Sequence, residues 1–257
     1  MSGVGQPRVA VIGAGMSGLL CGIRLKDAGI TDFTIYEKAD RVGGTWRENT
    51  YPGLACDVPS HLYRYTFAPN PEWSHRFSPG AEIQAYFEKT AADFGLESSI
   101  RYNTEITRCE FAEGRWKLEG AGGLRDTVDF VICATGVLHH PQEPEIEGLD
   151  SFAGATFHSA RWDHDVPLDG KRIGVIGTGS TAIQITDALV DRVAHLALFQ
   201  RTVFILELVR DHDQFVEAPL EALQFLRKAL VICVRHTFNI VSVARYGQMC
   251  GVINNDT

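Results

Sequence analysis

The sequence Arg8-Val-Ala-Val-Ile-Gly-Ala-Gly-Met-Ser-Gly18 decides the fold. Its β-branched run at residues 9–12 predicts a short, buried parallel strand. Apolar residues recur at helical spacing after this stretch, and Gly29 is placed to end the helix. A second strand is predicted for residues 33–36. Strand, glycine turn, helix and strand together predict one βαβ unit.

The turn between the first strand and the helix carries Gly13, Gly15 and Gly18, which is the spacing of a dinucleotide-binding loop. The first glycine permits the tight turn, the second lets backbone approach a pyrophosphate, and the third lets helix and strand pack closely. Glu37 follows the second strand, 24 residues after Gly13, where a carboxylate can accept hydrogen bonds from ribose hydroxyls. The alternative is a plain glycine-rich turn followed by a solvated Glu.

The same pattern returns at Arg172-Ile-Gly-Val-Ile-Gly-Thr-Gly-Ser-Thr-Ala182, 164 residues further on. That separation is too long for a solenoid repeat, so we expect two nucleotide-binding domains. Arg201 stands 24 residues after Gly177. An Arg at this offset suits a 2′-phosphate, although it could also be a surface cation at a strand end. The residues alone therefore predict one adenine dinucleotide with a free ribose, NAD or FAD, and one NADPH.

Composition sets broad limits on the chain. It has 257 residues, of which 45% are hydrophobic and 22% charged, as in a soluble globular protein of one or two domains. The formal charge of −8 makes sequence-independent binding of nucleic acid a poor prospect, because that binding needs a basic surface. No secretory leader is recognisable, and the apolar stretch at residues 229–244 is interrupted by Arg235 and His236. We therefore predict no transmembrane segment.

The six cysteines contain no CxxC pair, which argues against a disulfide reductase and against a zinc site. Several of them, including Cys133, stand in apolar surroundings and are expected to be small buried side chains. This cysteine usage predicts the cytoplasm, and no metal site is predicted. A helix is expected at residues 78–95, with Ser78 as its cap.

Several further segments carry a family resemblance. They are Arg41-Val-Gly-Gly-Thr-Trp46, Tyr51-Pro-Gly-Leu-Ala-Cys-Asp57, Ala134-Thr-Gly136 and Phe199-Gln-Arg-Thr202. The most specific is Phe152-Ala-Gly-Ala-Thr-Phe-His-Ser-Ala-Arg-Trp-Asp163, which fits the pattern FxGxxxHxxxW[P/D]. Together with the two glycine loops, they make the chain resemble the Baeyer–Villiger monooxygenases and their relatives, the flavin-containing monooxygenases, over about residues 8–204.

The resemblance implies an α/β fold with two dinucleotide-binding domains, a Rossmann-like FAD domain and a partial Rossmann-like NADPH domain. It divides the chain into an FAD-binding part at 1–140, a linker at 141–170 and an incomplete NADPH-binding part at 171–257. Later strands of the second sheet are not evident, so we expect the sequence to be the N-terminal portion of a longer protein. Residues 218–250 are interpreted as a helical insert in the NADPH domain or, alternatively, an amphipathic docking helix.

Site residues follow from the resemblance by position. Those implied to line FAD are Gly13, Gly15, Gly18, Glu37, Gly44, Thr45, Trp46, Asp57, Tyr63, Thr135 and Gly136. Those implied to hold NADPH are Gly177, Thr178, Gly179, Ser180, Thr181, Arg201 and Thr202. The linker signature consists of Phe152, Gly154, His158 and Trp162, and its histidine is implied to coordinate domain movement with catalysis.

The implied reaction is the insertion of one oxygen atom of O2 into a ketone, giving an ester or lactone. In this family NADPH reduces FAD, and the reduced flavin reacts with O2 to form a C4a-peroxyflavin that attacks the ketone. Asp57 is the implied catalytic residue, because the acid at this position sits under the flavin and pairs with an active-site Arg. The alternative for Asp57 is a helix or turn cap.

Two other functions stay open on the sequence alone. A flavin-containing monooxygenase that oxidises nitrogen or sulfur is the near alternative, and Trp162 argues against it, since those enzymes carry another aromatic residue there. A nucleotide-binding remnant without turnover is the non-enzymatic alternative, because the Arg partner of Asp57 is not identifiable. The sequence predicts no particular ketone and no oligomeric state.

Overall fold

A computed structural model describes residues 6–200 and the backbone of residues 251–255. Arg201, Thr202 and the segment at 218–250 lie outside the described residues. The chain divides into two compact units, one made of residues 1–50 and 54–140, the other of Tyr51–Gly53 and 141–257. Each unit has its own parallel strand pairing at its centre, in agreement with the predicted α/β class.

The first unit is built on a parallel sheet in the order β3-β2-β1-β7. The strands are β1 (Val9–Ile12), β2 (Phe33–Tyr36), β3 (Ile100–Arg101) and β7 (Phe130–Cys133). β1 lies between β2 and β7, and its pairing is parallel on both sides. The predicted bounds of the first two strands are confirmed. Their short β-branched and aromatic runs suit a position with both faces covered.

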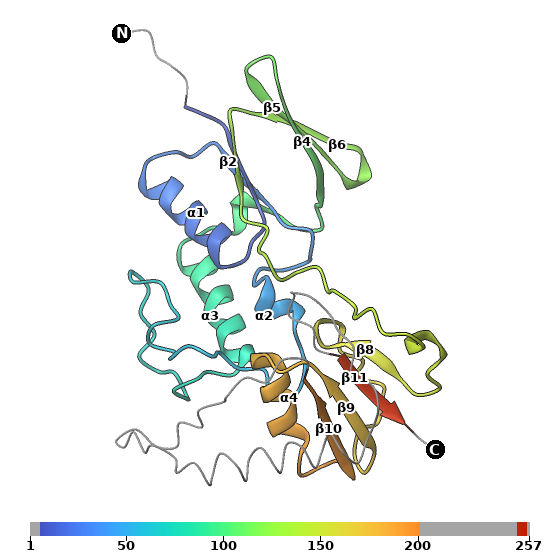
Figure 1. The fold of residues 1–257 in the computed structure, drawn as a ribbon. Helices are drawn as coiled ribbons and strands as arrows, with labels where there is room; N and C mark the ends of the chain where they lie inside the picture. Colours follow the sequence, from blue (N-terminus) through green and yellow to red (C-terminus); the bar gives the residue numbers. More distant parts are fainter. Residues whose placement is uncertain (1–5, 201–250, 256–257) are drawn as a thin grey trace, which may run out of the picture. The chain divides into compact units, whose positions relative to one another are not determined.

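Helices cover one face of this sheet. α1 (Met16–Asp27) and α3 (Gly80–Asp93) contact each other and lie on the same face (Figure 1). The core between helices and sheet includes Val11, Leu19, Ile23 and Phe87. α2 (Thr45–Glu48) is a single turn, and a 3₁₀ turn (Glu97–Ser99) precedes β3. The helices therefore shield the side chains of alternate strand residues, as the two-residue period of a strand requires.

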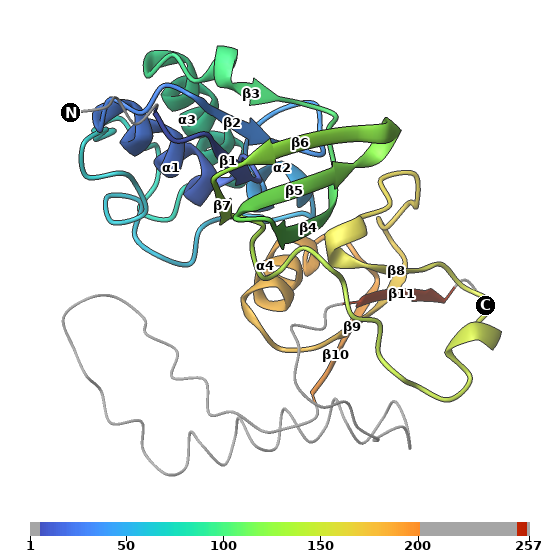
Figure 2. The same cartoon turned by 90° about the horizontal axis from the view of Figure 1, so that it is seen from above.

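An antiparallel sheet covers the opposite face of the parallel sheet (Figure 2). It consists of β4 (Ile106–Ala112), β5 (Arg115–Gly120) and β6 (Leu124–Val128), with a 3₁₀ turn (Ala121–Gly123) before β6. Ala10 and Tyr36 of the parallel sheet form a second core with Leu118 and Val128. The first unit is thus a three-layer structure of helices, parallel sheet and antiparallel sheet.

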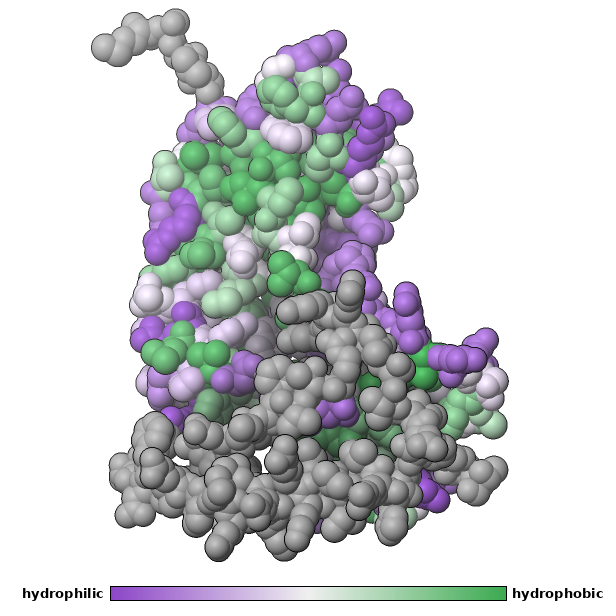
Figure 3. Space-filling view, viewed as in Figure 1, coloured by the Kyte–Doolittle hydropathy of each residue, from purple (hydrophilic) through white to green (hydrophobic). Residues whose placement is uncertain are grey.

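Two local predictions for this unit are wrong. Ser78 does not cap α3, because its hydroxyl lies 2.7 Å from that of Ser60, and Pro79 is the residue that precedes the helix. Cys133 is exposed rather than buried, because it ends β7, the outer strand of the parallel sheet among the described residues. Phe130 of the same strand is also exposed, and hydrophobic side chains gather on the face of this unit that Figure 3 shows.

The second unit has a sheet in the order β10-β9-β11-β8. Its elements are β8 (Thr156–His158), β9 (Arg172–Ile176), α4 (Ser180–Leu189), β10 (His195–Phe199) and β11 (Gly251–Asn255), with 3₁₀ turns at Leu149–Ser151 and Ser159–Arg161. β9 and β10 are parallel, and α4 connects them. β11 pairs antiparallel with both β8 and β9. The unit formed by β9, α4 and β10 agrees with the repeat of the glycine pattern at residues 172–182, whereas β11 was not predicted.

A short segment from early in the chain belongs to the second unit. Tyr51 is buried, and its hydroxyl donates a hydrogen bond to Oε1 of Gln184 in α4 (2.9 Å). Gly53 has a φ of +79°, and a Cβ there would lie 2.4 Å from the carbonyl oxygen of Gln184. Only glycine fits this approach to the helix backbone. None of the helices in the described ranges has the length and hydropathy of a membrane span.

Asp126 links the two sheets of the first unit. Arg8 Nη2 lies 2.9 Å from Asp126 Oδ2, and the hydroxyl of Tyr36 donates to the same oxygen at 2.5 Å. Burial alone would raise the pKa of Asp126, but the hydrogen bonds from Arg8 and Tyr36 outweigh it and hold the pKa below the usual value. Burial and the bond to Asp126 raise the pKa of Tyr36 to about 12. The ionised carboxylate is therefore the form that stabilises the fold.

We predict that Asp126→Asn lowers the free energy of unfolding by about 1–3 kcal/mol at pH 7, because it removes an ionised hydrogen-bond acceptor from a largely buried position. The contribution of Asp126 is present above its unfolded pKa of about 4 and is lost as the pH falls through the lower folded value. The difference between variant and unmodified chain should therefore shrink below about pH 4. Urea denaturation at several pH values measures it. Asp93→Asn, which changes an exposed pair with Lys89, is the matched control, and an equal effect of both substitutions would contradict the prediction.

Candidate dinucleotide sites

Two glycines of the first loop are required by the fold itself. Gly13 has a φ of +102°, and a Cβ there would lie 2.5 Å from the carbonyl oxygen of Ala134. A Cβ on Gly18 would lie 1.8 Å from the carbonyl oxygen of Gly13. Side chains at these two positions would force β1, α1 and the end of β7 apart. The first and third glycines thus have the structural roles that the motif assigns to them.

Gly15 differs from its two neighbours in the motif. Its φ is −79°, which any residue can adopt, and among the described residues a Cβ there would meet only Gly44, with Cα at 3.6 Å and N at 3.9 Å. Packing therefore does not require glycine at this position. Gly15 immediately precedes α1, so a bare backbone lies beside the free N–H groups at the helix N-terminus. That arrangement is suited to the close approach of a phosphate.

A second glycine segment lies against this loop. The N–H of Gly43 donates to the carbonyl oxygen of Ala14 (3.0 Å). Gly44 has a φ of +55°, and a Cβ there would lie 3.2 Å from Gly15 Cα. Thr45 and Trp46 follow at the start of α2. The structure therefore brings Gly44, a predicted FAD residue from the segment at 41–46, directly beside the first glycine loop.

Trp46 and Tyr63 form an aromatic pair next to this segment. The indole N–H of Trp46 donates to the hydroxyl of Tyr63 (3.0 Å), and the rings meet edge to face at 5.6 Å. Burial raises the pKa of Tyr63, and the hydrogen bond from Trp46 opposes that rise only in part. Tyr63 is therefore a neutral phenol at ordinary pH. Two residues that are 17 positions apart in the sequence are thus fixed against each other.

Glu37 lies at the carboxyl end of β2 and is buried, with an exposed fraction of 4%. The N–H of Ala14, inside the glycine loop, donates to its Oε2 (2.8 Å). The N–H of Ala39 donates to its Oε1 (2.9 Å). The predicted ribose-binding carboxylate therefore contacts the loop itself. The alternative interpretation, a solvated Glu after a plain glycine-rich turn, is wrong because Glu37 is buried.

Arg47 is a residue of this site that the sequence analysis missed. Its Nη1 lies 3.1 Å from Glu37 Oε1, and its Nη2 lies 3.1 Å from Glu48 Oε1. Beyond Glu48 stand Lys38, at 3.7 Å, and His139, at 3.7 Å. Alternating charges therefore extend from Glu37 through Arg47 and Glu48 to Lys38. The only sequence signal for Arg47 is that it follows directly on the Gly-Gly-Thr-Trp segment.

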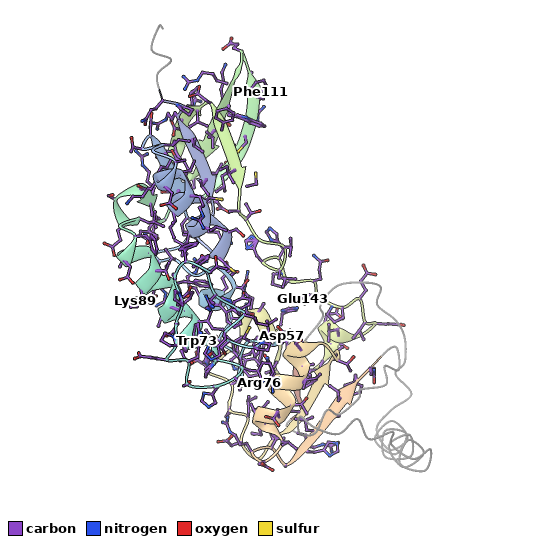
Figure 4. All side chains as sticks on the ribbon, turned by 90° about the vertical axis from the view of Figure 1, so that its left-hand side faces the viewer. Asp57, Trp73, Arg76, Lys89, Phe111 and Glu143 are labelled. Carbon is purple, nitrogen blue, oxygen red and sulfur yellow. The ribbon has the colours of Figure 1, made fainter. Side chains whose placement is uncertain are left out.

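The remaining residues predicted for the first site lie at two places. Thr135 and Gly136 follow β7 and are exposed, and a Cβ on Gly13 would lie 3.6 Å from Thr135 Cα. Asp57, labelled in Figure 4, belongs to the chain segment between α2 and α3, and it is exposed. Its neighbour Cys56 is buried, and that burial, with the nearby Asp57 charge, raises the pKa of the thiol. Asp57 is thus accessible to a ligand.

The second glycine loop repeats the geometry of the first. Gly177 has a φ of +115°, and its N–H donates to the carbonyl oxygen of Phe199 (2.9 Å). Gly179 has a φ of −76° and precedes α4, and among the described residues a Cβ there would meet nothing within 4 Å. Thr178, Ser180 and Thr181 surround it, and none of the three is buried. Gly179 therefore corresponds to Gly15, as a glycine that packing does not require.

The linker signature takes an ordered form in the second unit. His158 ends β8 and precedes a 3₁₀ turn, and its Nδ1 accepts a hydrogen bond from the N–H of Ala160 (3.1 Å). Trp162 packs edge to face against Phe157 at 5.1 Å. Phe152 and Gly154 precede β8 and are partly buried. His158 therefore has a turn-forming role that is compatible with its place in the signature.

No group of three or more His, Cys, Asp or Glu side chains suited to a metal ion occurs in the part of the chain that the structure describes. Arg201 and Thr202, predicted to hold the 2′-phosphate, lie outside the described residues. The described residues therefore include both predicted dinucleotide loops and, for the first of them, the predicted ribose-binding carboxylate of Glu37.

Comparison with known proteins gives consistent results. The model of the flavin-binding monooxygenase-like family matches residues 6–236. An uncharacterized monooxygenase of Mycobacterium tuberculosis is 58% identical over 196 residues, which cover 76% of this chain and 40% of that protein. A Baeyer-Villiger monooxygenase of Streptomyces coelicolor is 52% identical over 197 residues, covering 76% of this chain and 38% of that protein. The chain thus spans about two fifths of the length of these relatives.

Solved structures are similar over the same part of the chain. Cyclohexanone monooxygenase from Rhodococcus sp. Phi1 bound to NADP+ aligns with a TM-score of 0.69 at 36% identity, covering 76% of this chain and 38% of that one. The OTEMO complex with FAD and NADP aligns with a TM-score of 0.70 at 35% identity, covering 76% and 39%. The fold is therefore that of two-dinucleotide-binding proteins, as predicted.

We predict opposite effects for substitutions at two glycines of one loop. Gly18→Ala should lower the free energy of unfolding by about 2 kcal/mol or more, because its Cβ collides with backbone. Gly15→Ala should leave stability within about 1 kcal/mol but weaken FAD binding at least about tenfold, because the methyl group takes the place of the pyrophosphate. Urea denaturation and fluorescence titration measure the two effects. Gly179→Ala is the matched control and should spare FAD binding, and a Gly15→Ala chain that binds FAD normally would contradict the assignment.

Proposed function

The chain belongs to the flavin-binding monooxygenase-like family, and we propose that it binds FAD at the first glycine loop and NADPH at the second. The observation that carries this proposal is the pair of glycines that packing does not require, Gly15 and Gly179. Each leaves bare backbone at a helix N-terminus, where a pyrophosphate can approach. The similar protein that was solved with both FAD and NADP supports this pair of cofactors.

The family resemblance drawn from the sequence is confirmed. For the reaction we propose NADPH-dependent oxygenation of a ketone, in which one atom of O2 enters the substrate to give an ester or lactone and the other leaves as water. The Baeyer-Villiger relative and the Trp162 signature support this reaction over oxidation of nitrogen or sulfur. FAD, when bound, supplies hydride acceptance and oxygen activation, and the protein supplies binding, orientation and exclusion of water.

The proposed roles of the chain's own residues follow from their positions. Glu37 receives a ribose hydroxyl, Gly15 and Gly44 admit the pyrophosphate, and the Trp46–Tyr63 pair bounds the site. Asp57, which is exposed, is proposed to place its negative charge near the reacting end of the flavin. Arg201 and Thr202 are proposed to hold the 2′-phosphate of NADPH, with the turn residues Thr178, Ser180 and Thr181 along the pyrophosphate.

We propose that the FAD-binding part, the linker and the NADPH-binding part follow one another along the chain. Residues 1–140 form the FAD-binding part, residues 141–170 the linker with its signature, and residues 171–257 the NADPH-binding part. Tyr51–Gly53 is the exception, since these residues pack on α4 in the second unit. His158 is proposed to couple movement of the linker to the reaction, through the turn that its side chain holds.

An absorbance spectrum of the purified chain, followed by product analysis, tests this function. A flavin band that NADPH bleaches and air restores, with conversion of a ketone, is the expected result. Asp57→Asn should keep the flavin band and its bleaching while ketone conversion falls at least about tenfold, because the charge at the reacting end is lost. Asp27→Asn changes an exposed carboxylate of α1 paired with Arg24 and serves as the control. A colourless chain that takes up no added FAD would contradict the proposal.

Substitution of Arg201 tests the second cofactor. Arg201→Gln should raise the KM for NADPH by about tenfold or more and leave the KM for NADH nearly unchanged, because only NADPH carries the 2′-phosphate that a guanidinium binds. Steady-state reduction of the bound flavin with each nucleotide measures the preference. An equal loss for both nucleotides would show that Arg201 does not recognise the 2′-phosphate.

A further inference from the structure

The carboxylate of Glu37 and the guanidinium of Arg47 form a deeply buried ion pair in the first unit. Their side chains are 5% and 8% exposed, and Arg47 Nη1 lies 3.1 Å from Glu37 Oε1. The ion pairs of Arg108 and Lys117 on the antiparallel sheet, in contrast, have side chains that are about half exposed or more. Pairs of the exposed kind contribute little, whereas breaking a buried pair leaves a charge without compensation.

The contacts of Glu37 differ between its two oxygens. Oε1 is engaged twice, by the N–H of Ala39 at 2.9 Å and by Arg47 at 3.1 Å. Within the described part of the chain, Oε2 accepts one hydrogen bond, from the N–H of Ala14 at 2.8 Å. A carboxylate oxygen has two acceptor positions. The position that is still available for a hydroxyl donor is therefore on Oε2, the oxygen bound to the glycine loop.

Arg47 is itself held at two further points. Its Nη1 donates to the carbonyl oxygen of Arg41 (2.8 Å), and its Nη2 donates to Glu48 Oε1 (3.1 Å). These contacts come from both ends of the segment that carries Gly43 and Gly44. The guanidinium thus has a defined position in which it can face Glu37, and the planar group with its fixed donors suits this simultaneous contact better than an ammonium would.

We propose that Arg47 is a positioning residue for the adenosine end of the first site. It holds Glu37 by Oε1, so that a ribose hydroxyl is received at Oε2 beside the glycine loop, and it compensates the carboxylate charge once the ligand excludes water. The inference rests on the proposed binding of FAD and adds a residue that determines how tightly the adenosine half is bound.

A comparison of FAD with FMN tests this role, because FMN lacks the adenosine half. The 257-residue chain is freed of flavin and titrated with each ligand by fluorescence. Arg47→Met should weaken FAD binding at least about tenfold, since it leaves a buried carboxylate unpaired, and should leave FMN binding within about twofold. Arg47→Lys should bind FAD with intermediate affinity, because one ammonium cannot reach Glu37, Glu48 and the Arg41 carbonyl together.

Two further variants separate positioning from a loss of folding. Arg108→Met removes an exposed guanidinium from the antiparallel sheet and should change neither affinity. Glu48→Gln, which weakens the hold on Arg47, should reduce FAD affinity less than Arg47→Met does. If Arg47→Met weakens FAD and FMN equally, or binds FAD as tightly as the unmodified chain, the proposed role is overturned. Failure of the unmodified chain to bind FAD would instead overturn the proposed function itself.

Discussion

The contact between Gly18 and the carbonyl oxygen of Gly13 is the constraint on which the first unit depends. A Cβ at Gly18 would lie 1.8 Å from that oxygen, so helix α1 reaches its position against β1 only without a side chain there. The same approach brings the N-terminus of α1 to the carboxyl ends of β1 and β2. Because Gly13 also lies close to Ala134 after β7, these two backbone contacts set where the helix, the loop and three strands meet. The dinucleotide site that we propose at this edge follows from that packing.

The electrostatics of the site follow from the same geometry. Close packing at the strand ends removes Glu37 from water, leaving it 4% exposed, and a buried carboxylate is stable only when it is paired or hydrogen-bonded. Two backbone N–H groups and Arg47 meet this requirement. The feature that makes Glu37 suitable for a ribose, its place against the loop, thus also creates the need for a cation. Asp126 shows the same principle on the other face, where Arg8 and Tyr36 stabilise its ionised form.

Much of this could be predicted from local sequence. The strands at Val9–Ile12 and Phe33–Tyr36, the helix between them and the three roles of the glycines follow from short-range patterns, because a strand, a turn and a helix are each encoded by neighbouring residues. Arg47 could not be found in this way, since its partner Glu37 is ten positions away in another element and an Arg on a short helix is usually solvated. The exposure of Cys133 and the partner of Ser78 depend on strand order and on Ser60, which no local pattern specifies. β11 escaped prediction for the same reason, because its pairing joins residues more than 70 positions apart.

The two glycine loops show why a motif needs its structural context before it indicates function. Both contain a glycine with positive φ directly after a strand, Gly13 and Gly177, and these would be required in any protein with this turn. Gly15 and Gly179 have ordinary backbone angles and room for a methyl group, so neither the turn nor the packing explains why they are glycine. The proposed approach of a dinucleotide to the backbone would explain it. In each loop, the glycine that indicates a binding function is therefore the one that folding does not require, Gly15 in the first loop and Gly179 in the second.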